Sequence, residues 1–194
     1  MRYKQFPWGR LIFFATQNIH KFDEARRVLA EYGIAVAMLK AKASEIQDDD
    51  IGKIAEKGAR DAAAESHLPV IVEDAGLFIE ALGGFPGPYS SYVCRTIGTE
   101  GILKLLKGCE NRKAQFRSVV AFCNREKIVK TFQAVVEGTI AEGARGSKGF
   151  GFDPIFEPLE HQGKTFAELE IEEKNRLSHR ACALRKFAEW YKHF

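Results

Sequence analysis

The sequence predicts an α/β fold in which helices flank a central, twisted, mixed sheet. An apolar strand at 11–15, an amphipathic helix at 20–32 and a second strand at 35–39 form a strand–helix–strand opening, which is typical of parallel pairing. Two further segments, 116–123 and 128–137, are separated by a short polar turn and indicate an antiparallel pair. At 194 residues the chain fits one domain, so both kinds of pairing are expected in one sheet.

The first elements rest on simple patterns. Residues 11–15 form a continuous apolar run, as in a strand buried on both faces. The helix at 20–32 has a single apolar face, and Gly33 is placed to end it. That face consists of Phe22, Ala25, Val28 and Leu29.

The middle of the chain alternates between helix and strand. Residues 51–66 are rich in Ala, Lys and Glu with an apolar stripe, so a helix is expected. A short buried strand is predicted at 69–72, followed by a Gly- and Pro-rich loop at 83–88. Residues 89–106 are expected to form two short helices that divide near Gly98.

The last third of the chain begins with the strand pair, whose connecting turn is expected at 124–127. Residues 138–151 hold five glycines and are predicted to be the end of a strand followed by a loop. The final helix should begin near Ser178, because an apolar stripe follows at helical spacing. That stripe consists of Leu184, Phe187, Ala188 and Tyr191.

Composition excludes several classes of protein. With 45% hydrophobic residues the chain has enough apolar surface to fold, so it is not intrinsically disordered. A net charge of +3 is too small to favour nucleic-acid binding but suits an anionic small molecule. No apolar run approaches the roughly 18 residues of a membrane span, and no signal peptide is recognisable, so a cytoplasmic location is expected. The four cysteines match no zinc or redox spacing and are expected to be reduced thiols.

The turn after the first strand is the first candidate site. A strand end followed by a helix start favours anions, because free backbone N–H groups and the helix dipole both point there. Lys21 adds a positive charge. The alternative is an ordinary helix cap. The turn consists of Thr16, Gln17, Asn18, Ile19, His20 and Lys21.

An acidic set is the second candidate. Glu73 and Asp74 are predicted to stand where a buried strand ends, the edge at which α/β folds place ligands. With Glu45 they could hold Mg²⁺ together with substrate phosphates, although strand-end acids also commonly bind turn amides. The run at 48–50 is interpreted as a solvated helix start instead.

Two later motifs complete the candidates. The loop at 147–154 carries Phe150 and Phe152, which could stack on a base or simply pack in the core. Near Ser178, the cationic side chains of His179 and Arg180 oppose the helix dipole, which suggests a binding role; solvent exposure is the alternative.

These four segments together resemble one family, the inosine triphosphate pyrophosphatases, also called Ham1-like, from about residue 11 to 186. The stretch at 89–98 is most similar to archaeal members. The family's motifs are found as Thr16-x-Asn18-x-x-Lys21-x-x-Glu24, the Glu73 to Gly87 block, Phe150-Gly151-Phe152-Asp153-Pro154, and Lys174-x-x-x-Ser178-His179-Arg180.

The resemblance implies a fold of two lobes with an active-site cleft between them, and a homodimer. It implies a Mg²⁺-dependent hydrolase that splits inosine, deoxyinosine and xanthosine triphosphates into monophosphate and pyrophosphate, which cleanses the nucleotide pool. Residues 1–10 would be an N-terminal extension, and 11–194 the catalytic domain.

The resemblance also implies roles for individual residues. Glu45 and Asp74 would bind Mg²⁺, and Asp74, assisted by Glu73 and Lys21, would act on the attacking water. Arg180 or His179 would donate to the 6-oxo group of the base, which adenine lacks. The substrate contacts carried over are Thr16, Gln17, Asn18, Ile19, His20, Lys21, Lys57, Ala75, Ser91, Arg95, Phe150, Gly151, Phe152, Asp153, Lys174, His179 and Arg180.

Three other functions remain open at this level. The chain could be a nucleotide-binding protein without activity, although a pure binder needs no metal-binding carboxylates. It could be a pyrophosphatase for other modified nucleotides. An RNA-binding module using Phe150 and Phe152 is disfavoured by the modest charge.

Overall fold

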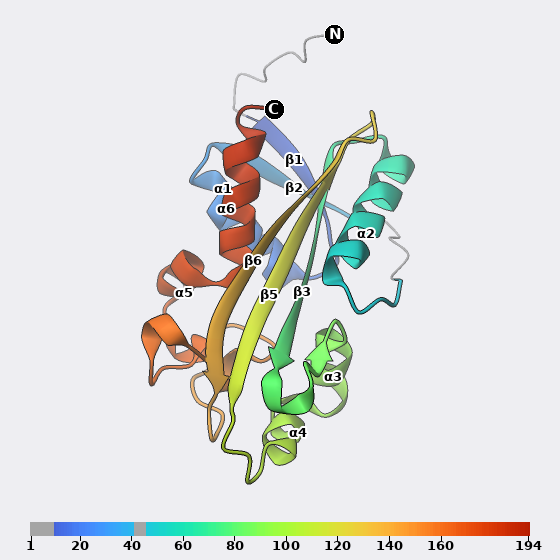
Figure 1. Ribbon diagram of the computed structural model, residues 1–194. Helices are drawn as coiled ribbons and strands as arrows, with labels where there is room; N and C mark the ends of the chain where they lie inside the picture. Colours follow the sequence, from blue (N-terminus) through green and yellow to red (C-terminus); the bar gives the residue numbers. More distant parts are fainter. Residues whose placement is uncertain (1–9, 41–45) are drawn as a thin grey trace.

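The computed structural model describes residues 10–40 and 46–194. Within these residues seven strands form one sheet in the order β2-β1-β3-β5-β6-β7, with β4 paired to β3 (Figure 1). The strands are β1 (Arg10–Ala15), β2 (Ile34–Leu39), β3 (Val70–Ile79), β4 (Pro86–Gly87), β5 (Lys113–Cys123), β6 (Val129–Ile140) and β7 (Phe156–Pro158). The helices are α1 (Ile19–Ala30), α2 (Ile51–Ser66), α3 (Ser90–Thr96), α4 (Gly98–Leu105), α5 (Ile171–Leu177) and α6 (His179–Tyr191).

The sheet is mixed, which confirms the predicted fold class. β1 pairs in parallel with both β2 and β3, whereas β3, β5, β6 and β7 pair in antiparallel succession. From β1 the chain passes through α1 to β2 on one side, and then through α2 to β3 on the other. The carboxyl end of β1, together with the part of β3 that follows the end of their pairing, therefore forms a topological switch point, the place where open α/β sheets bind ligands.

Helices cover both faces of the sheet around β1, β3 and β5. Alternate residues of β5 show this, because Val120 and Phe122 pack with α1 and α6, whereas Val119 and Ala121 pack with α2. A separate apolar core, built from β3, β5, α3, α4 and the segment from Phe152 to Leu177, fills the other end of the long strands, opposite the C-terminus (Figure 1). The chain thus has cores at two ends of the same strands.

Most predicted elements are confirmed, with small shifts of their ends. α2 has the predicted bounds, Gly33 follows α1 with a φ of 68°, and α3 and α4 divide at Gly98. α5 was not predicted, because its seven residues are too few to show a clear apolar period.

The prediction that the third strand ends at residue 72 is wrong. β3 continues to Ile79, and all ten of its residues pair with β5. Leu77 and Ile79 are fully buried in the second core, and this burial favours the extension across Gly76. Glu73 and Asp74 consequently lie within a long strand and not at its end.

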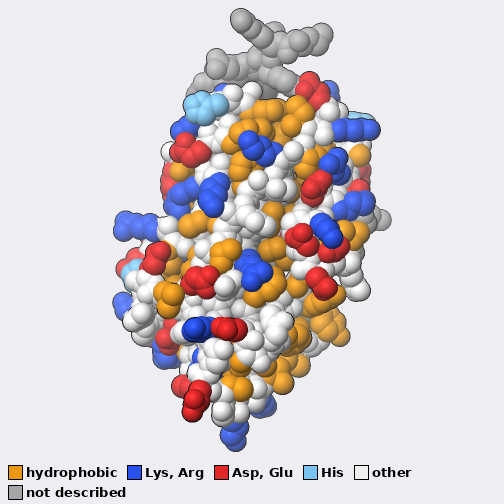
Figure 2. Space-filling model, in the orientation of Figure 1, with side chains coloured by type: hydrophobic (Ala, Val, Ile, Leu, Met, Phe, Trp, Pro, Cys, Tyr) orange, Lys and Arg blue, Asp and Glu red, His pale blue; other side chains and the backbone are white. Residues whose placement is uncertain are grey.

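The surface carries both signs of charge. On the face drawn in Figure 2, Lys and Arg side chains are interspersed with Asp and Glu. Among the described residues no helix is long and apolar enough to cross a membrane.

Candidate active site

The candidate site lies along an edge of β3 that, within the described residues, is not covered by another strand over part of its length. Pairing between β1 and β3 stops at Phe14 and Ile71, and β4 joins the same strand only from Leu77 onward. The turn between β1 and α1 approaches this gap, and Lys21 Nζ donates a hydrogen bond to the main-chain oxygen of Glu73 at 3.2 Å. Two of the four predicted segments are therefore brought together at the switch point.

Glu73 and Asp74 point to opposite faces of β3. Successive side chains of a strand alternate, and the register with β5 is continuous through both residues. Glu73 points toward α6, where Arg180 lies 3.1 Å away, so Asp74 points toward the face that α2 covers. The two carboxylates do not act as a neighbouring pair.

The turn after β1 uses most of its polar groups internally. The Thr16 hydroxyl accepts from the Asn18 amide, and Asn18 Oδ1 accepts from the amides of His20 and Lys21, which caps α1. The ordinary cap is thus present, and fewer free N–H groups remain than the sequence suggested. The ammonium group of Lys21 is the charged donor of this turn.

The Glu73 side chain is fully buried and surrounded by donors. Ser118 Oγ donates to its Oε1 at 2.7 Å, and Lys21 Nζ and Arg180 Nε lie 3.0 and 3.1 Å from its Oε2. Burial by itself would raise the pKa of Glu73, but the charges of Arg180 and Lys21 hold this pKa well below its usual range. The cations therefore favour the ionised form of Glu73 and weaken it as a base.

A second buried carboxylate, Glu24, joins α1 to the C-terminal segment. Its Oε1 accepts from Lys174 Nζ at 2.8 Å, and its Oε2 accepts from Arg180 Nη1. Lys174 also donates to Asp153 Oδ2 at 2.7 Å. All four side chains are at most 8% exposed, so the interpretation of the basic motif as solvated is wrong. These carboxylates offset the cationic start of α6.

His179 is a neutral, buried ring. It stacks on Phe116 with the ring centroids 4.4 Å apart and the planes 6° from parallel. Burial and the neighbouring Arg180 charge lower its pKa to about 3. Three of the four buried side-chain atoms that lack a hydrogen-bond partner among the described residues belong to this cluster: His179 Nδ1, Arg180 Nε and Glu73 Oε2. Arg180 Nε and Glu73 Oε2 face each other as an ion pair, which leaves His179 Nδ1 as the one of the three atoms without a hydrogen-bond or ion-pair partner among the described residues. Because buried polar groups are normally satisfied, this atom marks a place where a ligand could bind.

The aromatic loop offers one ring and not two. Phe152 is a buried member of the second core, whereas Phe150 is partly exposed and stacks against His20 at 5.2 Å. The Lys174 ammonium and the Arg180 guanidinium lie 5.1 and 5.2 Å from the centre of the Phe150 ring. Of these two rings, only Phe150 is accessible for stacking with a planar ligand.

Backbone contacts hold this loop in place. The Phe150 amide donates to Asp153 Oδ2 at 2.7 Å. Gly149 has a φ of 75°, and a side chain there would collide with the same carboxylate. Asp153 is therefore used to shape the loop and to bind Lys174, while Gly151 remains on the surface.

The remaining predicted residues that the structure describes lie outside the buried charge cluster. On α2, Lys57 pairs with Asp61 at 2.5 Å. On α3, Ser91 and Arg95 are exposed, as are Gln17 and Ile19 in the first turn. Ala75 faces Ser118 of β5 in the sheet register, and Glu45 lies outside the described residues.

The described residues fit a magnesium ion only in part. They contain no group of three or more His, Cys, Asp and Glu that could hold a metal. Magnesium bound with a phosphate ligand needs only one or two carboxylates, however. Asp74, half-buried at the open edge of β3, can serve as one of them, whereas Glu73 is occupied by cations.

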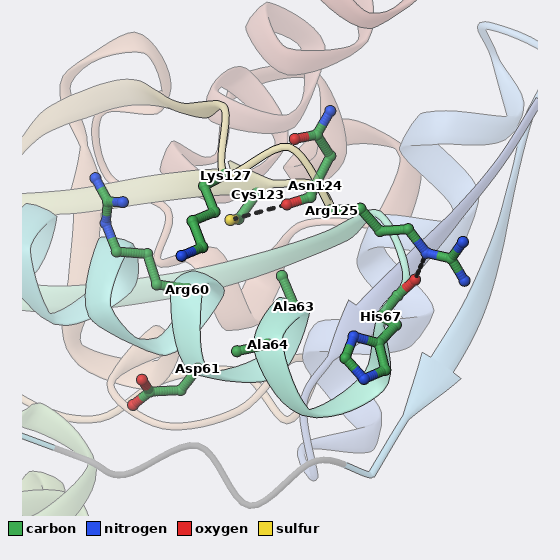
Figure 3. Close-up of a pocket in the computed structure, with 9 residues that line it drawn as sticks. All are labelled: Arg60, Asp61, Ala63, Ala64, His67, Cys123, Asn124, Arg125 and Lys127. Atoms are coloured by element: carbon green, nitrogen blue, oxygen red, sulfur yellow. Dashed lines mark hydrogen bonds between the residues drawn. The ribbon is translucent and has the colours of Figure 1, made fainter. Parts of the chain in front are cut away.

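A pocket elsewhere on the surface does not coincide with this cluster (Figure 3). It opens between α2 and the turn joining β5 to β6, where Arg125 donates to the His67 main-chain oxygen. None of the predicted site residues lines it, and its single carboxylate, Asp61, is paired with Lys57. We therefore take the cluster at the switch point as the candidate functional site.

Three contributors were missed by sequence reasoning as site residues. Glu24 was recognised as part of a motif but given no role, although it stands one helical turn after Lys21 and so shares its face. Ser118 and Phe116 lie on β5, in a segment that gives only a strand pattern. Nothing in that pattern distinguishes them from core residues.

Comparisons with known proteins identify the family of this chain. Residues 12–190 match the family model described as Ham1 family. The chain is 56% identical over 181 residues to the dITP/XTP pyrophosphatase of Methanopyrus kandleri, covering 93% of this chain and 96% of the relative. It is 51% identical to the protein of the same name from Thermococcus kodakarensis, covering 92% and 96%. A HAM1 protein from Coxiella burnetii has a similar structure, with a TM-score of 0.83, 31% identity, and coverage of 95% and 100%.

Proposed function

The chain belongs to the Ham1 family, and on that premise we propose that it hydrolyses deaminated purine nucleoside triphosphates to the monophosphate and pyrophosphate. Inosine, deoxyinosine and xanthosine triphosphates would be its substrates, and removing them would cleanse the nucleotide pool. The observation that carries the proposal is the buried charged group of Glu73, Arg180 and His179, which lies beside the partly exposed ring of Phe150 and next to Lys21.

The phosphates would bind at the turn after β1. Lys21 supplies positive charge at the switch point, and Thr16 and Asn18 supply short polar side chains. Lys21 already has an anionic partner in Glu73, which keeps the ammonium group on the β3 edge while the substrate enters. The same charge would stabilise the negative charge that develops during phosphoryl transfer.

Asp74 is the best candidate for acting on the attacking water. It lies on the uncovered stretch of β3, and its side chain is on the opposite face from the saturated Glu73. A carboxylate at hydrogen-bond distance from water can orient it or accept its proton. Magnesium, when bound with the triphosphate, would neutralise phosphate charge. Asp74 would hold the ion, and Glu45, by the family resemblance, would be the second ligand.

Base selection would depend on the start of α6. Arg180 carries only donors, and Phe150 offers a stacking surface beside it. A 6-oxo purine accepts from such a donor, whereas adenine presents an amino group and would leave the buried donor unpaired. A site of this kind can discriminate strongly between the two bases.

One assay tests the activity. The purified protein is incubated with Mg²⁺ and, separately, inosine, xanthosine, adenosine or guanosine triphosphate, and pyrophosphate is resolved from orthophosphate. We expect pyrophosphate and monophosphate, formed fastest from the inosine and xanthosine substrates. Asp74→Asn should abolish turnover while leaving substrate binding measurable, and a chelator should stop the wild-type reaction. Orthophosphate release, or equal use of adenosine triphosphate, would overturn the proposal.

We further propose a homodimeric, cytoplasmic protein with the two-lobed catalytic domain at 11–194. Apolar side chains on the β4–α3 segment support self-association, because Tyr89 and Tyr92 are 42% and 62% exposed. Light scattering during size-exclusion chromatography should give twice the 21.8 kDa chain mass. A monomer at micromolar concentration would contradict the dimer.

A further inference from the structure

Ser118 lies beneath the active-site cluster without reaching its surface. It stands in the middle of β5, between Ala75 of β3 and Ala134 of β6, and its side chain is fully buried. Its hydroxyl donates to Glu73 Oε1 at 2.7 Å. The proposed function gives Ser118 no role, although this residue holds one of the two carboxylate oxygens of Glu73.

The consequence appears at the other oxygen of Glu73. Because Oε1 is taken by Ser118, Lys21 Nζ and Arg180 Nε both converge on Oε2, at 3.0 and 3.1 Å. Neither Oε2 nor Arg180 Nε makes a well-aligned hydrogen bond there. Lys21 and Arg180 could each pair with a separate oxygen of Glu73, but both are held close to Oε2.

We propose that Ser118 is a positioning residue, which locks the Glu73 carboxylate and thereby sets the separation between Lys21 and Arg180. This inference rests on the proposed function, in which Lys21 binds phosphate and Arg180 binds the base. The terminal torsion of a glutamate is broad, so the hydroxyl is needed to hold one orientation. Without it the carboxylate can rotate and give one oxygen to each cation.

A change in the distance between Lys21 and Arg180 would weaken the binding of one class of substrate most. A 6-oxo purine triphosphate must engage Lys21 and Arg180 at once, and misplacement of either group weakens its binding. Adenosine triphosphate gains little from Arg180 and has less to lose. Ser118 would thus act on discrimination between bases although it touches no substrate.

The experiment compares Ser118→Ala with the wild-type enzyme on inosine and adenosine triphosphates. For the inosine substrate we expect kcat/KM to fall about tenfold, the size of one charge-assisted hydrogen bond, mainly through KM. For adenosine triphosphate kcat/KM should fall only about twofold, so the preference for inosine over adenosine triphosphate becomes smaller. Ser118→Cys, which keeps a weak donor of similar size, should give an intermediate preference and stays informative if the alanine variant does not fold.

Ser90→Ala is the matched control. Ser90 is also buried, and its hydroxyl bonds to the main chain of Leu77 and Gly87, away from the cations. Its loss should lower the unfolding temperature without changing the preference. If the Ser118 variants lose stability but keep the wild-type preference, the positioning role is refuted. If the wild-type enzyme itself shows no preference, the proposed function fails and this inference falls with it.

Discussion

Glu24→Gln is the sharpest test of the buried charge cluster. The substitution keeps the shape of the side chain but removes the negative charge that Lys174 and Arg180 share. Both cations remain buried, and among the described residues Asp153 is still paired with Lys174 and Glu73 with Arg180. Breaking a buried pair from one side is strongly destabilising, because an uncompensated charge is left behind.

The expected loss in the free energy of unfolding follows from the pKa of Glu24. Burial alone would raise this pKa, but the charges of Arg180 and Lys174 lower it from 4.5 to about 2. At about 1.4 kcal/mol per pH unit, this shift corresponds to about 3 kcal/mol of stability at neutral pH. The free energy of unfolding of the variant should therefore be lower by about 3 kcal/mol, within the range of roughly 3–5 kcal/mol expected for a broken buried pair.

Guanidinium denaturation at several pH values measures the effect. A carboxylate with a lowered native pKa stabilises the fold above its unfolded pKa, and this contribution is lost as pH falls through the native value. The difference in free energy of unfolding between the wild type and Glu24→Gln should hence be constant above about pH 5 and shrink between pH 4.5 and pH 2. Carboxylates remote from Glu24 titrate in both proteins and cancel in the difference.

Glu31→Gln provides the control. Glu31 also pairs with an arginine, Arg185 at 3.3 Å, but its side chain is 50% exposed. An exposed pair contributes at most about 1 kcal/mol, so this variant should unfold nearly as the wild type does. A loss below about 1 kcal/mol for Glu24→Gln, or a difference that does not change with pH, would refute the reasoning.

Three further outcomes are expected. Lys21→Ala should raise KM for inosine triphosphate about 10- to 100-fold, as for one charge-assisted hydrogen bond, and an unchanged KM would remove Lys21 from phosphate binding. His179 should stay neutral, so its NMR signals should not titrate between pH 5 and pH 9; a midpoint in that range would contradict its lowered pKa of about 3. Phe150→Leu should weaken nucleotide binding about tenfold, since stacking contributes roughly 1–3 kcal/mol, without affecting binding of inorganic triphosphate. Equal losses for both ligands would exclude base stacking.

The sequence alone determined the type and order of the main elements. The apolar run at 11–15, the stripe of α2 and the paired strands β5 and β6 have periodicities that local chemistry imposes. It also predicted the four segments of the candidate site, since Gly, Pro and charged residues interrupt these patterns there. The ends of β3 and the existence of α5 could not be predicted from the sequence, because burial against distant elements decides them.

Only the tertiary structure decided which partners the charged residues of the candidate site have and how deeply they are buried. In the sequence, Glu73 and Asp74 are equivalent acids, but alternation along β3 turns one toward the cations of α6 and the other away. Glu24 and Arg180 are 156 positions apart and are brought into contact only where α1 packs on α6. The physical reason is that charge burial, and with it the pKa of each group, depends on partners that are remote along the chain.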